Sequence, residues 1–114
     1  MILGQSMPAP SDFFPGLRED DKIPRDWGSP KPNKKQGTGY RWQDPDDVGN
    51  GIRIDKGDPD HPLASQQVDH VVVRYRGHVI GRGGNPISGS IRNDPVNAHI
   101  PIKDWLQWRN WYSP

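Results

Sequence analysis

The sequence predicts an α+β fold, in which a small twisted antiparallel β-sheet with one or two helices packed on it follows a proline-rich arm. Short apolar stretches recur between Gly, Pro and Asp turns, which is typical of strands, and an aromatic stretch near the C-terminal end has helical spacing. At 114 residues and 31% hydrophobic content, the chain has room for one small domain with a thin core. The absence of cysteine excludes disulfides and thiolate metal sites.

The chain has two regions that differ in composition and in the periodicity of their apolar residues. Residues 1–36 combine prolines with scattered charges and no sustained period, so we expect an arm or linker that is partly extended. Its apolar anchors to the rest of the chain are Phe13, Phe14, Leu17, Ile23 and Trp27. Residues 37–114 are expected to form the folded domain. Within it, strands are expected at 40–42, 52–55, 69–76 and 78–82, with possible strands at 89–92 and 97–100.

The strongest strand signal, residues 69–82, contains two histidines and three arginines. Side chains alternate between the two faces of a strand, so His70 and Arg74 share one face. Glycine costs stability inside a strand, which favours a two-residue hairpin turn at Arg76-Gly77. This turn pairs His78 with Tyr75. In a continuous strand, His78 would instead lie on the face of His70.

The C-terminal stretch predicts a helix of about three turns over residues 102–112, because Pro101 suits the first position of a helix. At helical spacing, Trp105, Trp108 and Tyr112 fall on one flank. We expect this apolar flank to cover one side of the sheet.

Charge is distributed unevenly although the formal net charge is only +1. Residues 39–60 carry three basic residues against six Asp, a net of −3, whereas residues 61–114 carry six basic residues against three Asp, a net of +3. The second stretch also contains all four histidines. No stretch reaches the ~18 apolar residues that span a bilayer, and no signal-peptide pattern begins at Met1, so we expect no membrane segment and no export signal of the chain's own.

Histidines and arginines on a sheet suit RNA cleavage in which the 2′-hydroxyl attacks its own phosphodiester. An imidazole titrates near neutral pH and can move the protons, while arginines stabilise the phosphate charge. The catalytic candidates are His70, His78, His99 and Arg74. The substrate-binding candidates are Arg41, Trp42, Arg53, Arg76, Arg82, Ser90 and Arg92. No cofactor and no metal are expected.

Plainer interpretations of the same residues stay open. They fit the wet face of a half-exposed sheet, and a tryptophan at the start of a strand is often a core residue. Metal binding is a rival use, in which His70 and His78 would join Asp69 or Asp94 and His99 would add a nitrogen. However, their spacing matches no metal motif.

The order of these pieces resembles the C-terminal nuclease toxin domains of bacterial polymorphic toxins, including those of contact-dependent growth inhibition. It is also similar to the barnase, EndoU, colicin and RelE class of ribonucleases. The residues that carry the resemblance are a proline-rich lead, Gly37-Thr38-Gly39-Tyr40-Arg41-Trp42, Ile52-Arg53-Ile54, Gly57-Asp58-Pro59, the hairpin at 69–82, and Ala98-His99-Ile100-Pro101 before an aromatic stretch. Ribosome-inactivating colicins place an Asp and His pair in the arm, whereas this arm has no histidine.

The resemblance implies an antibacterial, metal-independent endoribonuclease that cleaves RNA, most often transfer RNA. It also implies delivery from the cell surface or by secretion as part of a larger effector, action in the cytoplasm of the target cell, and a monomer bound by a cognate immunity protein. Three alternatives remain: a metal-dependent DNase toxin, a colicin-like toxin that cleaves ribosomal RNA, and a non-catalytic nucleic-acid-binding module.

Overall fold

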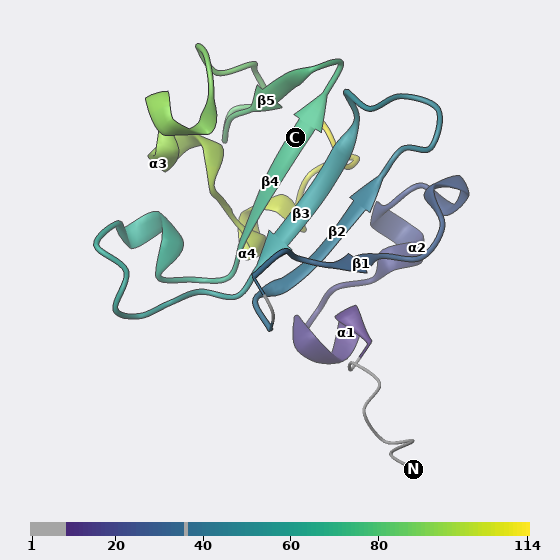
Figure 1. Cartoon of the computed structure of the whole chain (residues 1–114), viewed down its shortest axis with the longest axis horizontal. Coiled ribbons are helices and arrows are strands. Elements are labelled where there is room, and N and C mark those ends of the chain that lie inside the picture. Colours follow the sequence, from purple (N-terminus) through teal and green to yellow (C-terminus); the bar gives the residue numbers. More distant parts are fainter. Residues whose placement is uncertain (1–8, 36) are drawn as a thin grey trace.

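Figure 1 shows the computed structural model, which describes residues 9–35 and 37–114. In this described part, six strands form one antiparallel sheet in the order β1-β2-β3-β4-β5, and β6 pairs with the start of β4. This architecture confirms the α+β fold with a small antiparallel sheet. The strands are β1 (Lys31–Pro32), β2 (Gly39–Gln43), β3 (Gly51–Asp55), β4 (His70–Tyr75), β5 (His78–Ile80) and β6 (Ile100–Pro101).

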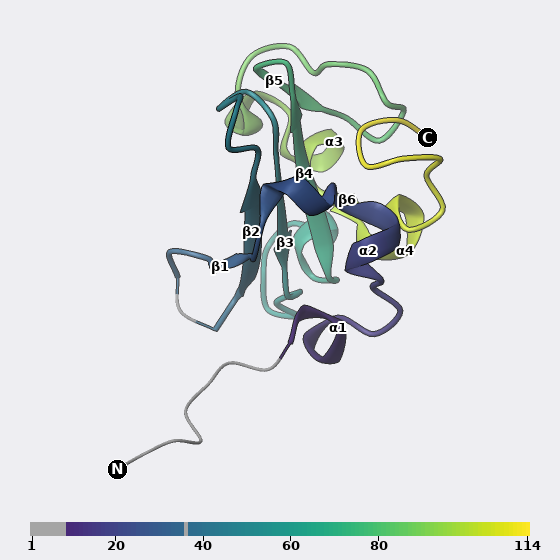
Figure 2. The same ribbon diagram turned by 90° about the vertical axis from the view of Figure 1, so that its right-hand side faces the viewer.

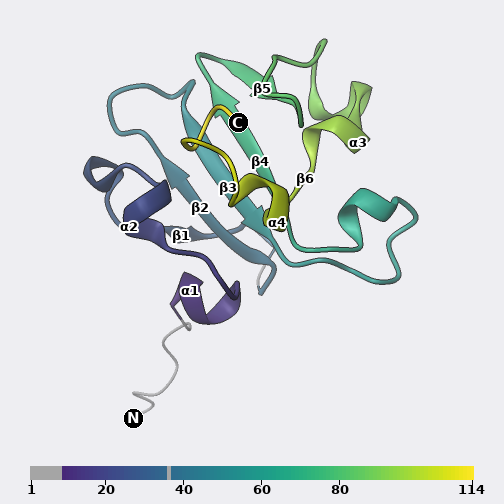
Figure 3. The same ribbon diagram turned by 180° about the vertical axis from the view of Figure 1, so that it is seen from behind.

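The helical elements are single turns of three or four residues. They are α1 (Pro10–Phe13), α2 (Glu19–Lys22), η1 (Arg25–Trp27), η2 (Ala64–Gln66), η3 (Ile91–Asn93), α3 (Pro95–Ala98) and α4 (Ile102–Trp105). Figures 2 and 3 show α1, α2, α4 and the C-terminal segment on one face of the sheet. On the other face, Val72 of β4 is buried in a second, smaller hydrophobic cluster with Val79, Ile87 and Ala98. No helix in the described part of the chain has the length and apolar character needed to cross a membrane.

The core lies between the sheet and this helical layer. Alternate residues of the three central strands are buried there: Tyr40, Trp42, Ile52, Ile54, Val71 and Val73. Phe14 and Trp105 are fully buried against them. Residues of the expected arm belong to this same core, since Leu17, Ile23 and Trp27 are also buried in it. β1 then extends the sheet, so this core contains residues from both sides of residue 36.

The expected hairpin is confirmed. Tyr75 pairs with His78, and Arg74 pairs with Val79. The two turn residues have positive φ, +52° at Arg76 and +83° at Gly77. Positive φ at both central positions is typical of the turn type that matches the twist of a hairpin, and Gly77 adopts it without steric cost.

Three sequence expectations about local structure were wrong in whole or in part. The helix expected over 102–112 ends at Trp105, where the backbone bonds change: Gln107 N and Trp108 N donate to the carbonyls three residues back, Asp104 O and Trp105 O. The strand expected at 89–92 is an irregular stretch leading into η3. Of the strand expected at 97–100, only Ile100 pairs with β4, because α3 continues to Ala98.

Candidate active site on the open sheet face

The face of the sheet opposite the core carries the polar residues of β1 to β4. The register pairs Arg41 with Arg53, and Asp55 with His70, so each pair shares a face across neighbouring strands. Arg74 lies on the same face as His70, as the alternation predicts. The sequence therefore builds one wet face from residues that lie up to 33 positions apart, from Arg41 to Arg74.

A cleft of about 910 Å³ lies over this face. Residues 31–35 and the loop between β3 and β4 supply part of its lining. Among the described residues, the cleft lining includes two carboxylates, Asp55 and Asp58. Its cations are more numerous: Lys31, Lys34, Lys35, Arg41, Arg53, Lys56 and Arg74. The excess of positive charge suits a polyanionic ligand.

Asp55 is the centre of a hydrogen-bonded cluster at the bottom of the cleft. Its Oδ2 lies 2.8 Å from Arg53 Nε and 3.5 Å from His70 Nε2, and its Oδ1 accepts a hydrogen bond from Asn33 Nδ2 at 2.6 Å. Burial of this carboxyl opposes its ionisation, but the His70 hydrogen bond and the Arg53 charge outweigh burial. The pKa of Asp55 is therefore below its usual value, and the residue is a carboxylate at neutral pH.

His70 is only 4% exposed, and both of its ring nitrogens face oxygen atoms. Nδ1 lies 2.7 Å from Val68 O, and because a carbonyl can only accept, Nδ1 is the donor. Nε2 is left facing Asp55 Oδ2, and that contact becomes an ion pair when His70 is protonated. His70 thus has Nδ1 held by the Val68 carbonyl and Nε2 held against the Asp55 carboxylate.

His99 packs edge-on against His70, with 5.0 Å between the ring centroids. Its Nδ1 lies 2.6 Å from Pro95 O, at the end of α3. Burial is the main cause that lowers the pKa of His99, and the neighbouring His70 and Arg53 lower it further. His99 is therefore neutral at neutral pH and contacts His70 from the side away from the cleft lining.

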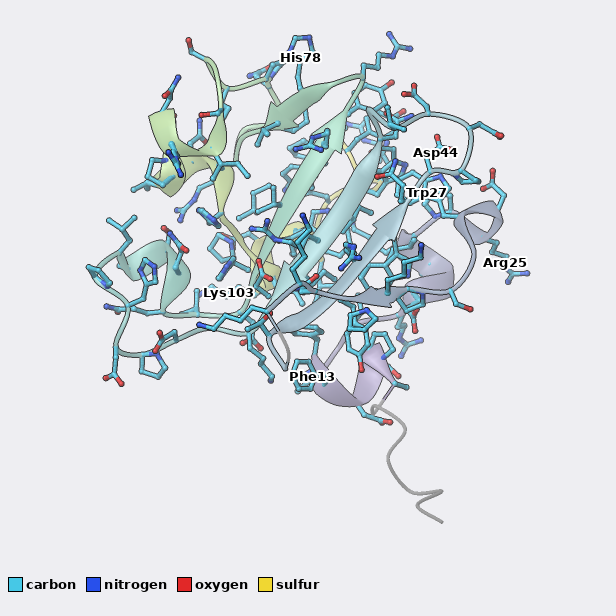
Figure 4. All side chains as sticks on the ribbon, in the orientation of Figure 1. Phe13, Arg25, Trp27, Asp44, His78 and Lys103 are labelled. Carbon is cyan, nitrogen blue, oxygen red and sulfur yellow. The ribbon has the colours of Figure 1, made fainter. Side chains whose placement is uncertain are left out.

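His78 lies apart from this cluster. It begins β5 and pairs with Tyr75, at the opposite end of β4 from His70. Five residues of extended strand separate the two ends by about 17 Å. Figure 4 shows His78 at the rim of the molecule, and its side chain is exposed.

The remaining predicted substrate-binding residues are divided between cleft, core and surface. Arg41 and Arg53 line the cleft, whereas Trp42 is 3% exposed and packs in the core. The other four are exposed and lie outside the described cleft lining: Arg76, Arg82, Ser90 and Arg92.

Sequence reasoning missed five residues that line the cleft. Asp55 lies in the strand expected at 52–55 but is not among the site candidates, although its alternation with Arg53 on that strand indicates a shared face. Asn33 and the lysines at 31, 34 and 35 were assigned to the arm. A basic run immediately before the first strand was the available signal for them.

The described residues contain no group of three or more His, Asp or Glu placed to hold a metal ion. Asp69, a candidate ligand in the rival metal reading, accepts a hydrogen bond from Gly57 N at 2.8 Å and lies 3.5 Å from Lys56 Nζ. Comparison with models of protein families, with curated proteins and with solved structures gives no match.

Proposed function

We propose that this chain is a metal-independent endoribonuclease domain that cleaves RNA by attack of the 2′-hydroxyl on the adjacent phosphate. The observation that carries the proposal is the Asp55, His70 and Arg53 cluster at the bottom of a cation-rich cleft. His70, which can transfer a proton, and Arg53, which can bind a phosphate, then lie in one cluster, and this reaction needs both groups from a protein.

In this reaction His70 removes the proton from the 2′-hydroxyl. Nε2 is the nitrogen that takes it, because Nδ1 already donates to Val68 O, and this step requires the 2′-hydroxyl to reach Nε2 beside Asp55 Oδ2. The 2′-oxygen bonds to phosphorus, the bond to the 5′-oxygen breaks, and that oxygen takes a proton from water. The imidazolium is stabilised by the Asp55 carboxylate 3.5 Å away.

Arginines on the same face hold the phosphate and stabilise its growing charge. Arg53 contacts Asp55 through Nε, so its two Nη nitrogens are not used in that contact. Arg74 lies two residues from Val72, which pairs with Arg53. His99 supports the His70 ring and is a positioning residue in this scheme.

The biological setting that we propose rests on the resemblance to polymorphic toxin domains. In that setting the chain is delivered as part of a larger effector and acts on transfer RNA in the cytoplasm of a competing bacterium. A cognate immunity protein binds it in the producing cell.

The test is incubation of the purified chain with total RNA and with plasmid DNA, each with and without a chelator. We expect RNA fragments with 2′,3′-cyclic phosphate ends in both RNA samples and intact plasmid. His70→Gln should lower RNA cleavage by about 100-fold or more, whereas the matched variant His78→Gln should cleave at the unaltered rate. Intact RNA would contradict the proposal, and plasmid cleavage that stops with chelator would favour the metal-dependent DNase.

A non-catalytic nucleic-acid-binding module is the second candidate. The observation in its favour is the burial of His70, which leaves 4% of the residue accessible. For that function the cations of the cleft would bind RNA while His70 and Asp55 only stabilise the sheet. RNA binding without any fragments, equal in the unaltered chain and in His70→Gln, would support it.

A further inference from the structure

A row of cations crosses the open face at right angles to the strands. Lys31 pairs with Arg41 in the register of β1 and β2, and Arg41 pairs with Arg53 in the register of β2 and β3. All three line the cleft. Adjacent strands lie about 4.8 Å apart, so the row extends about 10 Å across the sheet.

The side chains of this row are available to a ligand. Lys31 is exposed and makes no hydrogen bond or ion pair within the described part of the chain. Arg41 Nη1 donates to Pro32 O, which holds the guanidinium beside β1. Arg53 makes its Asp55 contact through Nε at 2.8 Å and presents its Nη groups as further donors.

The row also has a direction relative to the candidate active site. Its Arg53 end adjoins Asp55 and His70, whereas its Lys31 end is two strands away. A polyanion on the row would therefore have one charged group at His70 and further groups leading away from it.

We propose that this row is a track for the sugar-phosphate backbone of single-stranded RNA. Arg53 holds the reacting phosphate, and Arg41 and Lys31 hold the phosphates that follow on the same strand. This inference rests on the proposed function, because it takes His70 as the reaction centre. A duplex presents two backbones on either side of a groove, whereas the row is a single line of cations.

The test measures binding of 2′-O-methyl RNA, which lacks the attacking hydroxyl and is not cleaved. A dinucleotide and an octanucleotide are titrated by fluorescence anisotropy at several salt concentrations. Lys31→Gln should weaken octanucleotide binding about two- to fivefold and reduce the slope of log affinity against log salt by about 0.7, with dinucleotide binding unchanged. Arg25→Gln is the matched control, because Arg25 is exposed, outside the cleft lining and at the rim in Figure 4.

Four outcomes would overturn the track. They are equal effects of Lys31→Gln and Arg25→Gln, an equal loss for the dinucleotide, tighter binding of duplex than of single strands, and competition by polyglutamate as strong as that by RNA. Failure of the proposed function is separate. If the chain binds RNA through Lys31 but cuts none, the track stands and the ribonuclease proposal is contradicted. If Lys31→Gln cuts RNA as well as the unaltered chain does, the ribonuclease proposal stands and the track is contradicted.

Discussion

His99 lies in surroundings that disfavour a charged imidazole. Burial is the main cause of its lowered pKa, and His70 and Arg53 act in the same direction, while the Pro95 O hydrogen bond and the Asp55 charge oppose them. In the unfolded chain its pKa returns to about 6.5. Between the folded and unfolded pKa values the unfolded chain binds the extra proton, so acid favours unfolding.

We therefore expect the free energy of unfolding to fall as the pH drops below about 6.5, by at most about 1.4 kcal/mol per pH unit from this one residue. The loss should continue until the pH passes the lowered pKa of folded His99. Thermal unfolding followed by circular dichroism at pH values between 5.5 and 7.5 measures it. In His99→Gln the pH dependence should shrink, and in the exposed control His78→Gln it should not. Equal pH dependence in all three proteins would contradict this.

The site shows how far residue-level prediction extends. The shared face of His70 and Arg74 follows from alternation within one strand, so the sequence alone predicts it. The Asp55 and His70 contact depends on the register between β3 and β4, which only the folded pairing fixes. For the same reason His99, after α3, could be named as a candidate but not placed against the ring of His70.

The hairpin turn between β4 and β5 contains a strained residue. Arg76 has φ +52°, a conformation that side chains other than Asn, Asp and Gly adopt at a cost of about 1–2 kcal/mol. Its guanidinium lies 5.2 Å from the Tyr75 ring centroid, which offsets part of that cost. The turn also docks on the preceding loop, because Arg76 N donates to Asn50 Oδ1 at 2.9 Å.

Comparing two substitutions at this position separates the strain from the ring contact. Arg76→Ala and Arg76→Asn both lose the ring contact, but only Asn tolerates the positive φ well. We expect Arg76→Asn to be more stable than Arg76→Ala by about 0.5–1 kcal/mol in urea unfolding. RNA binding should be unchanged in both, because Arg76 is outside the cleft lining. If Arg76→Asn were less stable than Arg76→Ala, backbone strain at this position would be contradicted. If either variant bound RNA more weakly, Arg76 would belong to the RNA-binding site.

Elements were predictable where a local pattern decides them. The alternating residues of β3 and the turn residues of the hairpin gave both features correctly. The stretch after Trp105 has helical spacing, but its aromatic side chains pack in several directions. Trp105 Nε1 donates to Trp111 O at 3.0 Å, a contact that a continued helix does not allow. Tertiary packing therefore overrides the periodicity there.

At the scale of the whole molecule, the N-terminal segment is part of the fold. Phe14 is fully buried, and its neighbour Phe13 meets the Tyr40 ring of β2 edge-on at 5.9 Å between centroids. Composition predicted an arm because prolines and scattered charges leave no sustained apolar period in residues 1–36. Composition does not reveal that the few apolar residues between those prolines reach a common core.

Phe14→Ala should destabilise the chain by about 3–5 kcal/mol, since it leaves a cavity in the core. That loss is comparable to the whole stability of many small domains, so the melting temperature should fall steeply. Ser11→Ala, on the exposed side of α1, should leave it unchanged. If a chain that begins at residue 37 kept a cooperative transition of the same midpoint, the segment would be dispensable and this prediction wrong.

The core joins the two ends of the chain. Trp27 meets Trp111 with 4.8 Å between ring centroids, and Lys22 Nζ donates to Trp108 O at 2.6 Å. During synthesis Trp27 therefore lacks its ring partner until the stretch that contains Trp108 and Trp111 has been made. We expect the cleft, whose Lys31, Lys34 and Lys35 follow soon after Trp27, to be complete only after that C-terminal stretch has packed against Trp27.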